Sequence, residues 1–140
     1  MKLVRLSADE AYARWDEIRD SLQHCITKTR SRYRTEDAFL RMRVEPPSAW
    51  VYEIGPGCGF VIFTQEFDAD GLVLFVWALC AKPNALSGRK GEVYAELERI
   101  ARECKAKRIR MQSPRSGWAR ELFFDQVAIV YEHEVLNDIR

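Results

Sequence analysis

The sequence predicts one α/β (α+β) domain, with a mixed, mostly antiparallel sheet that is flanked by helices on both faces. Residues 72–80 are apolar almost throughout, which is typical of a strand buried on both sides in the centre of a sheet. The segment 92–105 has the apolar stripe of an amphipathic helix (Val93, Leu97, Ile100, Ala101, Cys104). Because 140 residues are near the usual size of one domain, we expect residues 1–140 to form a single unit.

The first part of the chain predicts a strand followed by a helix. Residues 1–6 alternate weakly between apolar and polar positions, as in a strand. Ser7 and Glu10 have the spacing of a capping box, in which each side chain bonds the backbone amide of the other residue. Apolar side chains then recur at helical spacing (Tyr12, Trp15, Ile18, Leu22), which predicts one helix of about four turns.

A basic segment separates this helix from a second, shorter one. Residues 28–34 alternate basic and polar side chains without an apolar face, so we predict a loop. Thr35 is expected to be the N-cap of the next helix, since the acids Glu36 and Asp37 that follow it suit a first helical turn. This helix should end before Pro46, because the residue before a proline disfavours the α conformation.

Strands fill the middle of the chain. Residues 50–54 and 59–67 are rich in strand-forming side chains, and residues 68–71 predict a hairpin turn in which Gly71 takes a positive φ. The helix at 92–105 then connects the strand at 72–80 to one at 108–112, as a right-handed crossover.

The remaining chain predicts one more helix and one more strand. Trp118, Leu122 and Phe123 indicate a short helix, and residues 127–135 alternate with period two. The expected order of elements is therefore β-α-α-β-β-β-α-β-α-β.

Charge is balanced over the whole chain but uneven along it. The net charge is +1, from 22 Lys and Arg against 21 Asp and Glu, which argues against a dedicated nucleic-acid binder. Residues 28–43 hold six basic and two acidic side chains, a local charge of +4. Such a patch favours an acidic small molecule or protein as partner, with a solvated loop as the alternative.

The composition indicates neither a membrane protein nor a metal or disulfide protein. The longest apolar run, residues 72–81, is too short to span a bilayer, and the first residues lack the apolar stretch of a signal peptide. We therefore expect a cytoplasmic protein. Its four cysteines (Cys25, Cys58, Cys80, Cys104) form no C-x-x-C pair, which favours free thiols.

The order of elements resembles that of the GNAT superfamily of N-acetyltransferases over nearly the whole chain. The local match lies in residues 72–80, Pro83, residues 87–91 and the helix up to Lys105. The resemblance implies that the strand backbone, at Leu79 and Cys80, pairs with the pantetheine arm of acetyl-CoA. It also implies that the following loop and helix start hold the pyrophosphate. The implied phosphate contacts are Ser87, Gly88, Arg89, Lys90, Gly91 and Glu92, with Arg115 as a further candidate.

Chemistry supports this site, although the loop departs from the family pattern. The first amides of a helix lack internal partners and attract anions, and glycines allow close approach of backbone to phosphate. Aligned on Gly91, however, the chain has Gly88 where the family has Gln or Arg, and Val93 where it has a small residue. An ordinary helix start remains the alternative.

The family's catalytic and acceptor positions are matched less directly. Many members use a glutamate near the central strand as a base. Residues 72–80 carry no acid, so Glu53 and Glu66 on the neighbouring strands are the candidates. Many members also use a tyrosine as the acid that protonates the departing thiolate. The corresponding stretch here, residues 122–125, contains no hydroxyl group. The region between the first two helices commonly shapes the acceptor site, which makes acceptor-binding candidates of Arg30, Arg32, Tyr33 and Arg34.

Two functions of different classes follow. The first is an acyl-CoA-dependent N-acyltransferase with an unknown amine acceptor. The second is a catalytically inactive GNAT-fold protein that serves as a binding or assembly module. The strand, loop and helix layout favours the enzyme, whereas the altered loop and the missing tyrosine favour the module.

Overall fold

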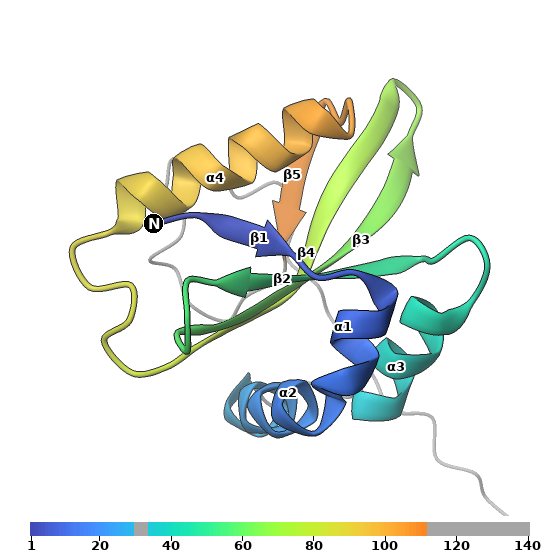
Figure 1. Ribbon diagram of the computed structural model, residues 1–140. Helices are drawn as coiled ribbons and strands as arrows, with labels where there is room; N and C mark the ends of the chain where they lie inside the picture. The colour runs from blue at the N-terminus through green and yellow to red at the C-terminus, as the bar shows by residue number, and fades with distance from the viewer. Residues whose placement is uncertain (30–33, 112–140) are drawn as a thin grey trace, which may run out of the picture.

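The computed structural model describes residues 1–29 and 34–111, which form a five-stranded sheet with helices on both faces (Figure 1). The strands are β1 (Leu3–Arg5), β2 (Ala49–Ile54), β3 (Gly59–Asp68), β4 (Gly71–Ala81) and β5 (Arg108–Met111). The helices are α1 (Ala8–Ala13), α2 (Trp15–Thr29), α3 (Thr35–Arg43) and α4 (Lys90–Glu103). The predicted short helix near Trp118 and the predicted strand at 127–135 lie outside the described residues.

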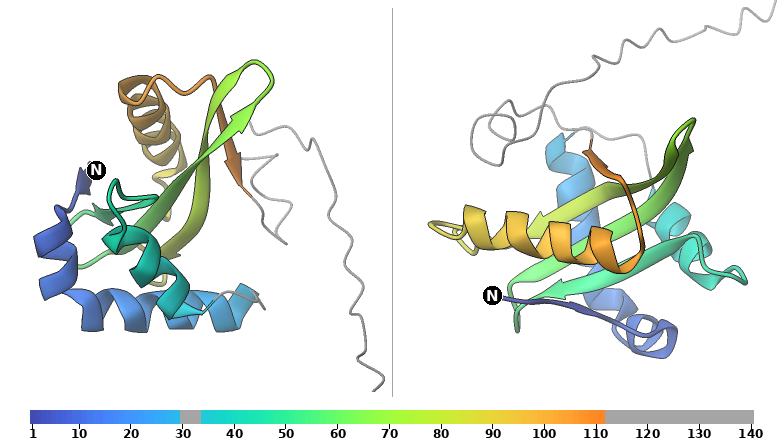
Figure 2. Two further views of the ribbon diagram at one scale, coloured as in Figure 1. Left: turned by 90° about the vertical axis from the view of Figure 1, so that its right-hand side faces the viewer. Right: turned by 90° about the horizontal axis from the view of Figure 1, so that it is seen from above.

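The strands follow one another across the sheet in the order β1-β2-β3-β4-β5. Each of the first three pairings is antiparallel, whereas β4 and β5 are parallel and are joined by α4. Figure 2 shows α4 crossing the sheet on the side away from α2 and α3. The predicted fold class is confirmed, and so is the interior position of residues 72–80, since β4 lies between β3 and β5.

Two apolar cores lie on the two faces of the sheet. On the α1–α3 face, Ile18 and Leu22 of α2 pack against Val51, Phe60 and Ile62 of the sheet. On the α4 face, the predicted helix stripe packs against the opposite side of the same strands (Val93, Leu97, Ile100, Ala101 with Ile54, Val61, Phe63, Leu74, Val76). Side chains of β3 alternate between these cores, because successive residues of a strand point to opposite faces.

The first helical segment contains a break that periodicity did not predict. The capping box is present, since the Glu10 amide donates to Ser7 Oγ at 3.1 Å and the Ser7 amide donates to Glu10 Oε1 at 3.0 Å. At Arg14, however, the backbone leaves the helix (φ −103°, ψ 17°), so α1 and α2 are separate. Tertiary contact overrides local preference here, because Arg14 reaches Glu53 of β2.

Two other predicted boundaries are wrong. Residues 28 and 29, expected to start a loop, belong to α2, which continues to Thr29 while Cys25 and Ile26 pack on the core. The N-cap of α3 is Arg34 rather than Thr35, which is buried in the first turn. There the Arg34 amide donates to Asp37 Oδ2 at 2.9 Å. The helix ends at Arg43, before Pro46 as predicted.

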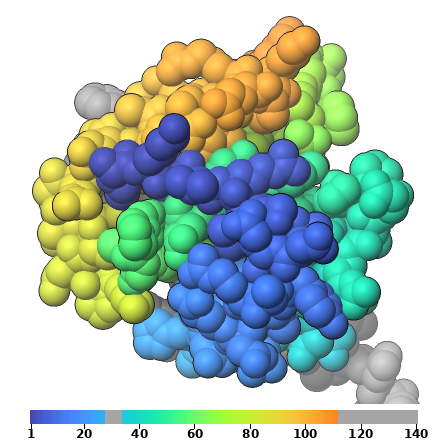
Figure 3. All heavy atoms as spheres, in the orientation of Figure 1, coloured from blue at the N-terminus to red at the C-terminus, as the bar shows by residue number. Residues whose placement is uncertain are grey.

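Side chains of α4 complete the outer edge of β1. The Leu3 amide donates to Glu96 Oε1 at 2.8 Å, and the Leu3 carbonyl accepts from Arg99 Nη2 at 2.9 Å. The space-filling view shows β1 lying between α4 and α1 (Figure 3). The Glu96–Arg99 ion pair therefore satisfies a donor and an acceptor of the sheet edge that would otherwise be unpaired.

In the part of the chain that the structure describes, no helix is both long enough and apolar enough to cross a bilayer.

Candidate functional site

A bulge bends β4 in its second half. Along β3 and β4 the register shifts at one point, where Ile62 is opposite Ala78 and Phe63 is opposite Val76, with Trp77 between them. As a result, Trp77 and Ala78 both pack on the α1–α3 face, whereas Val76 packs on the α4 face. A bulge of this kind bends the strand and redirects its side chains.

The second half of β4, after the bulge, runs to Ala81 and pairs with β3. Where the edge of a strand is free, its backbone can pair with an extended ligand, as in β-augmentation. Leu79 and Cys80, the positions implied to bind pantetheine, lie in this segment.

Helix α2 fixes this segment from the α1–α3 face. Ser21 Oγ donates to the Cys80 carbonyl at 3.4 Å, and Cys25 Sγ lies 3.8 Å from the Leu79 carbonyl oxygen. The pKa of the Cys80 thiol is raised by its hydrogen bond with Cys25 and then by burial. Cys80 is therefore protonated at neutral pH, which excludes it as a thiolate nucleophile.

The loop after β4 presents exposed backbone at the start of α4. Gly88 takes a positive φ of 71°, and an added Cβ at Gly88 or Gly91 would meet no atom within 4 Å. Arg89 is the N-cap of α4 and makes no side-chain cap bond. The six positions predicted to contact phosphate lie in the loop and in the first turn of α4, and all are exposed (Ser87, Gly88, Arg89, Lys90, Gly91, Glu92). Open space and uncapped amides make this helix start suitable for an anion.

Glu92, the acid in the first turn of α4, lies near two positively charged groups. Its Oε1 lies 3.5 Å from the Met1 ammonium group and its Oε2 lies 3.9 Å from Arg89 Nε. Both contacts are exposed, so they offset its charge only in part.

The two carboxylates predicted as base candidates are both ion-paired. Glu53 Oε2 lies 2.6 Å from Arg14 Nη2, and this hydrogen bond holds the pKa of Glu53 below its usual value. Glu66 Oε2 lies 3.1 Å from Arg110 Nη1. Glu53 therefore accepts a proton less readily, because protonation would weaken its ion pair with Arg14.

These carboxylates also differ in their position relative to β4. Glu53 is opposite Phe60, which is opposite Cys80, so Glu53 lies two strands away from the bent segment. Glu66 is opposite Val73, which is four residues before Trp77 or roughly 13 Å along the strand. Of the two, Glu53 is in register, through Phe60, with Cys80 of the strand segment implied to bind pantetheine.

The predicted acceptor residues are described only in part. Arg34 is exposed at the start of α3, whereas Arg30, Arg32 and Tyr33 lie outside the described residues, as does Arg115. The structure adds one residue that sequence reasoning did not single out. Arg41 of α3 places its Cζ 5.9 Å from the centroid of the Trp77 ring, at the bend in β4. No sequence signal identifies this pair, because it depends on the bulge.

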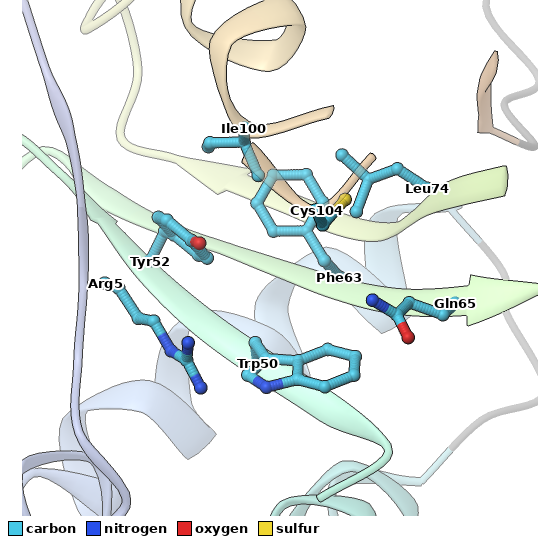
Figure 4. A pocket seen from close by; sticks show the side chains of 8 residues that line it. All are labelled: Arg5, Trp50, Tyr52, Phe63, Gln65, Leu74, Ile100 and Cys104. Carbon is cyan, nitrogen blue, oxygen red and sulfur yellow. The ribbon is translucent and has the colours of Figure 1, made fainter. Parts of the chain in front are cut away.

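A separate hollow of about 140 Å³ lies on the α4 face, near the end of α4 (Figure 4). It is lined by Arg5, Trp50, Tyr52, Phe63, Gln65, Leu74, Ile100 and Cys104. Burial raises the pKa of the Tyr52 hydroxyl, which therefore stays protonated at neutral pH. Because Trp77 packs on the opposite face, this hollow is distinct from the bent segment of β4.

The cysteines of the described chain are free thiols, as the spacing favoured. Within residues 1–29 and 34–111, no three His, Cys, Asp or Glu side chains gather as a metal site would require.

Comparison with known proteins identifies the fold. No protein-family model and no curated protein matches the sequence. Solved acetyltransferases, in contrast, match the structure over nearly its whole length. One is a probable acetyltransferase, with a TM-score of 0.60 and 19% identity, covering 98% of this chain and 100% of that chain.

Two other matches have more specific descriptions. An aminoglycoside acetyltransferase from an uncultured soil metagenomic sample, in complex with sisomicin, has a TM-score of 0.67 and 11% identity, covering 97% of this chain and 96% of that one. A ribosomal-protein-alanine N-acetyltransferase from Brucella melitensis biovar Abortus 2308 has a TM-score of 0.59 and 16% identity, covering 97% of each chain. At such low identities the likeness shows the fold alone, and that fold is the GNAT acetyltransferase fold.

Proposed function

We propose that this protein is an acyl-CoA-dependent N-acyltransferase, which transfers an acyl group such as acetyl from CoA to an amine. The bent second half of β4 carries this proposal, because it leads directly into the open loop and uncapped start of α4. The fold that this chain shares with solved acetyltransferases supports the same function.

In this proposal the chain binds acetyl-CoA in two places. The backbone at Leu79 and Cys80 pairs with the pantetheine arm, on the segment that α2 holds in position. The amides at the start of α4 bind the pyrophosphate, with Arg89 and Lys90 supplying positive charge. The full proposed phosphate set is Ser87, Gly88, Arg89, Lys90, Gly91, Glu92 and Arg115.

The proposed reaction joins the neutral amine nitrogen to the acyl carbon and breaks the carbon–sulfur bond, and the proton that the amine loses ends on the departing thiolate to give the CoA thiol. The chain contributes by holding the two reactants together, which can lower a barrier substantially without a base. Arg30, Arg32, Tyr33 and Arg34 are proposed to lie on the acceptor side.

Glu53 and Glu66 remain the proposed base candidates. Replacing the true base by glutamine should lower kcat by roughly a hundredfold or more, without weakening acetyl-CoA binding. Rates of CoA release by Glu53→Gln and Glu66→Gln therefore identify the base. Unchanged rates in both variants would indicate catalysis by positioning alone.

Gly91→Leu tests the phosphate site, because Gly91 has an ordinary φ and open space around its Cβ position. We expect the variant to fold at least as well as the original chain, since glycine within a helix costs about 0.5–1 kcal/mol. Acetyl-CoA binding should weaken at least tenfold, because the new side chain occupies the ligand's space. Thermal shift with acetyl-CoA measures both effects, and a ligand at a hundred times its Kd adds about 2.7 kcal/mol.

Ala95→Leu is the matched control, since Ala95 is an exposed residue one turn further along α4. It should leave the shift unchanged. If the original chain shows no shift at millimolar acetyl-CoA, the proposal is wrong. If it binds acetyl-CoA but acylates no amine, the chain is a catalytically inactive binding module.

A further inference from the structure

Arg41 places an exposed positive charge beside the bend in β4. Its Cζ lies 5.9 Å from the centroid of the Trp77 ring, within the range of a cation–π contact. Trp77 belongs to the bulge and lies two residues before Leu79, where the pantetheine arm is proposed to bind. The guanidinium therefore lies near the strand segment that is proposed to bind the pantetheine arm.

The backbone of Arg41 is fixed at the end of α3. Its carbonyl accepts the Ser48 amide at 2.9 Å and the Ser48 hydroxyl at 3.4 Å. Because Ser48 directly precedes β2, these bonds tie the last turn of α3 to the sheet. The position of Arg41 relative to Trp77 is therefore set by the fold rather than by a free loop.

The guanidinium of Arg41 forms no ion pair with any residue in 1–29 or 34–111. Three other arginines of the sheet and helices are ion-paired, unlike Arg41: Arg14 with Glu53, Arg99 with Glu96, and Arg110 with Asp68. A guanidinium stacked on a ring keeps its N–H edge open, and that planar edge matches the two oxygens of a carboxylate.

Arg43 offers a close comparison on the same helix. It is exposed and it too lies over aromatic rings, 5.2 Å from the Tyr12 centroid and 5.3 Å from that of Phe39. Tyr12 belongs to α1, so Arg43 is directed toward α1 rather than toward the bend in β4. The two arginines share charge, exposure and type of contact, and differ in which site they face.

We infer that Arg41 binds the carboxylate of the amine acceptor, so that the substrates of this site are small amines carrying a carboxylate group. This inference rests on the proposed acyl transfer. The planar N–H edge favours a carboxylate over an uncharged amide of the same shape, because hydrogen bonds between two charged groups are about twice as strong as neutral ones. The charge of +4 carried by residues 28–43 favours an acidic acceptor as well.

The test compares amines that differ only in this group. CoA release from acetyl-CoA is measured with glycine, β-alanine, 4-aminobutyrate and glutamate, each beside its carboxamide. The original chain should favour the best carboxylate by roughly ten- to a hundredfold in kcat/KM, the range expected for a hydrogen bond to a charged group. Arg41→Gln should remove this preference by lowering kcat/KM for the carboxylates. Arg43→Gln should keep the preference.

Each other outcome is decisive. Equal rates with carboxylates and carboxamides, or equal effects of the two substitutions, would overturn the role of Arg41 while acyl transfer stands. Acylation of no amine would overturn the proposed function and this inference with it. If Arg41→Gln fails to fold, Arg41→Lys keeps the charge without the planar edge, and a full preference in that variant would also overturn the role assigned to the guanidinium.

Discussion

At the scale of single residues, Arg14 shows how a distant contact reshapes local structure. Arginine suits a helix interior, so periodicity predicts an unbroken helix through this position. In the structure Arg14 Nη2 lies 2.6 Å from Glu53, 39 residues away, and its Cζ lies 5.4 Å from the Phe60 ring centroid. These contacts hold the junction of α1 and α2 against β2 and β3. No local pattern contains this information, because it depends on the partner strands.

The ion pair also predicts a dependence of stability on pH. The pKa of Glu53 is lowered in the folded chain, chiefly by its hydrogen bond with Arg14. Its stabilisation is therefore complete above the unfolded pKa of glutamate and is lost as the pH falls through the folded pKa. Glu53→Gln should cost about 1–2 kcal/mol at pH 7 and much less near pH 3, as measured by urea unfolding.

Glu17→Gln is the control, because Glu17 also contacts Arg14, at 3.2 Å, but is 54% exposed. An exposed pair is worth about 0.2–1 kcal/mol, so this variant should change little at either pH. An equal loss for Glu53→Gln at pH 7 and pH 3 would contradict the role given to the ion pair.

At the scale of elements, the sequence pattern predicts which strands and helices are buried more reliably than it predicts the residues at which they begin and end. The apolar run at 72–80 and the stripe on α4 predict an interior strand and a packed helix, because burial alone decides both. Helix ends, the break at Arg14 and the bulge at Trp77 depend on partners elsewhere in the chain. The loop at 87–91 is located by its glycines, whereas Arg41 joins the candidate site only through the bulge.

The edge of β1 depends on a contact that the helix pattern does not predict. Glu96 lies outside the apolar stripe of α4, yet it stabilises this edge. Glu96 has only 12% of its side chain exposed, and it bonds both the Leu3 amide and Arg99. Glu96→Ala should cost about 1–3 kcal/mol, because it leaves the Leu3 amide and Arg99 without this acceptor. Urea unfolding measures the loss, and hydrogen exchange at Leu3 should become faster.

Glu98→Ala provides the comparison on the same helix. Glu98 contacts Arg102 at 3.7 Å and is 43% exposed, so its removal should change stability by less than about 1 kcal/mol. Equal losses in the two variants would show that the contact with β1 contributes nothing beyond an ordinary surface ion pair.

At the scale of the whole molecule, two cores share one sheet. Ile18 of α2 and Ile100 of α4 are 0% and 3% exposed, on opposite faces. Strand β3 contributes Phe60 and Ile62 to one core, and Val61 and Phe63 to the other. Neither core can therefore be lost without exposing the strands that complete the other.

This arrangement predicts that the two faces unfold as one cooperative unit. Ile18→Val and Ile100→Val should each cost about 0.5–1.5 kcal/mol, since each removes one buried methylene group. Their effects should add within about 0.5 kcal/mol, because the two side chains lie on opposite faces and share no contact. Urea unfolding should give coincident transitions by circular dichroism and tryptophan fluorescence, with an unchanged m value. Transitions that separate in either variant would mean that the layers melt independently, and the chain would then contain two folding units rather than one.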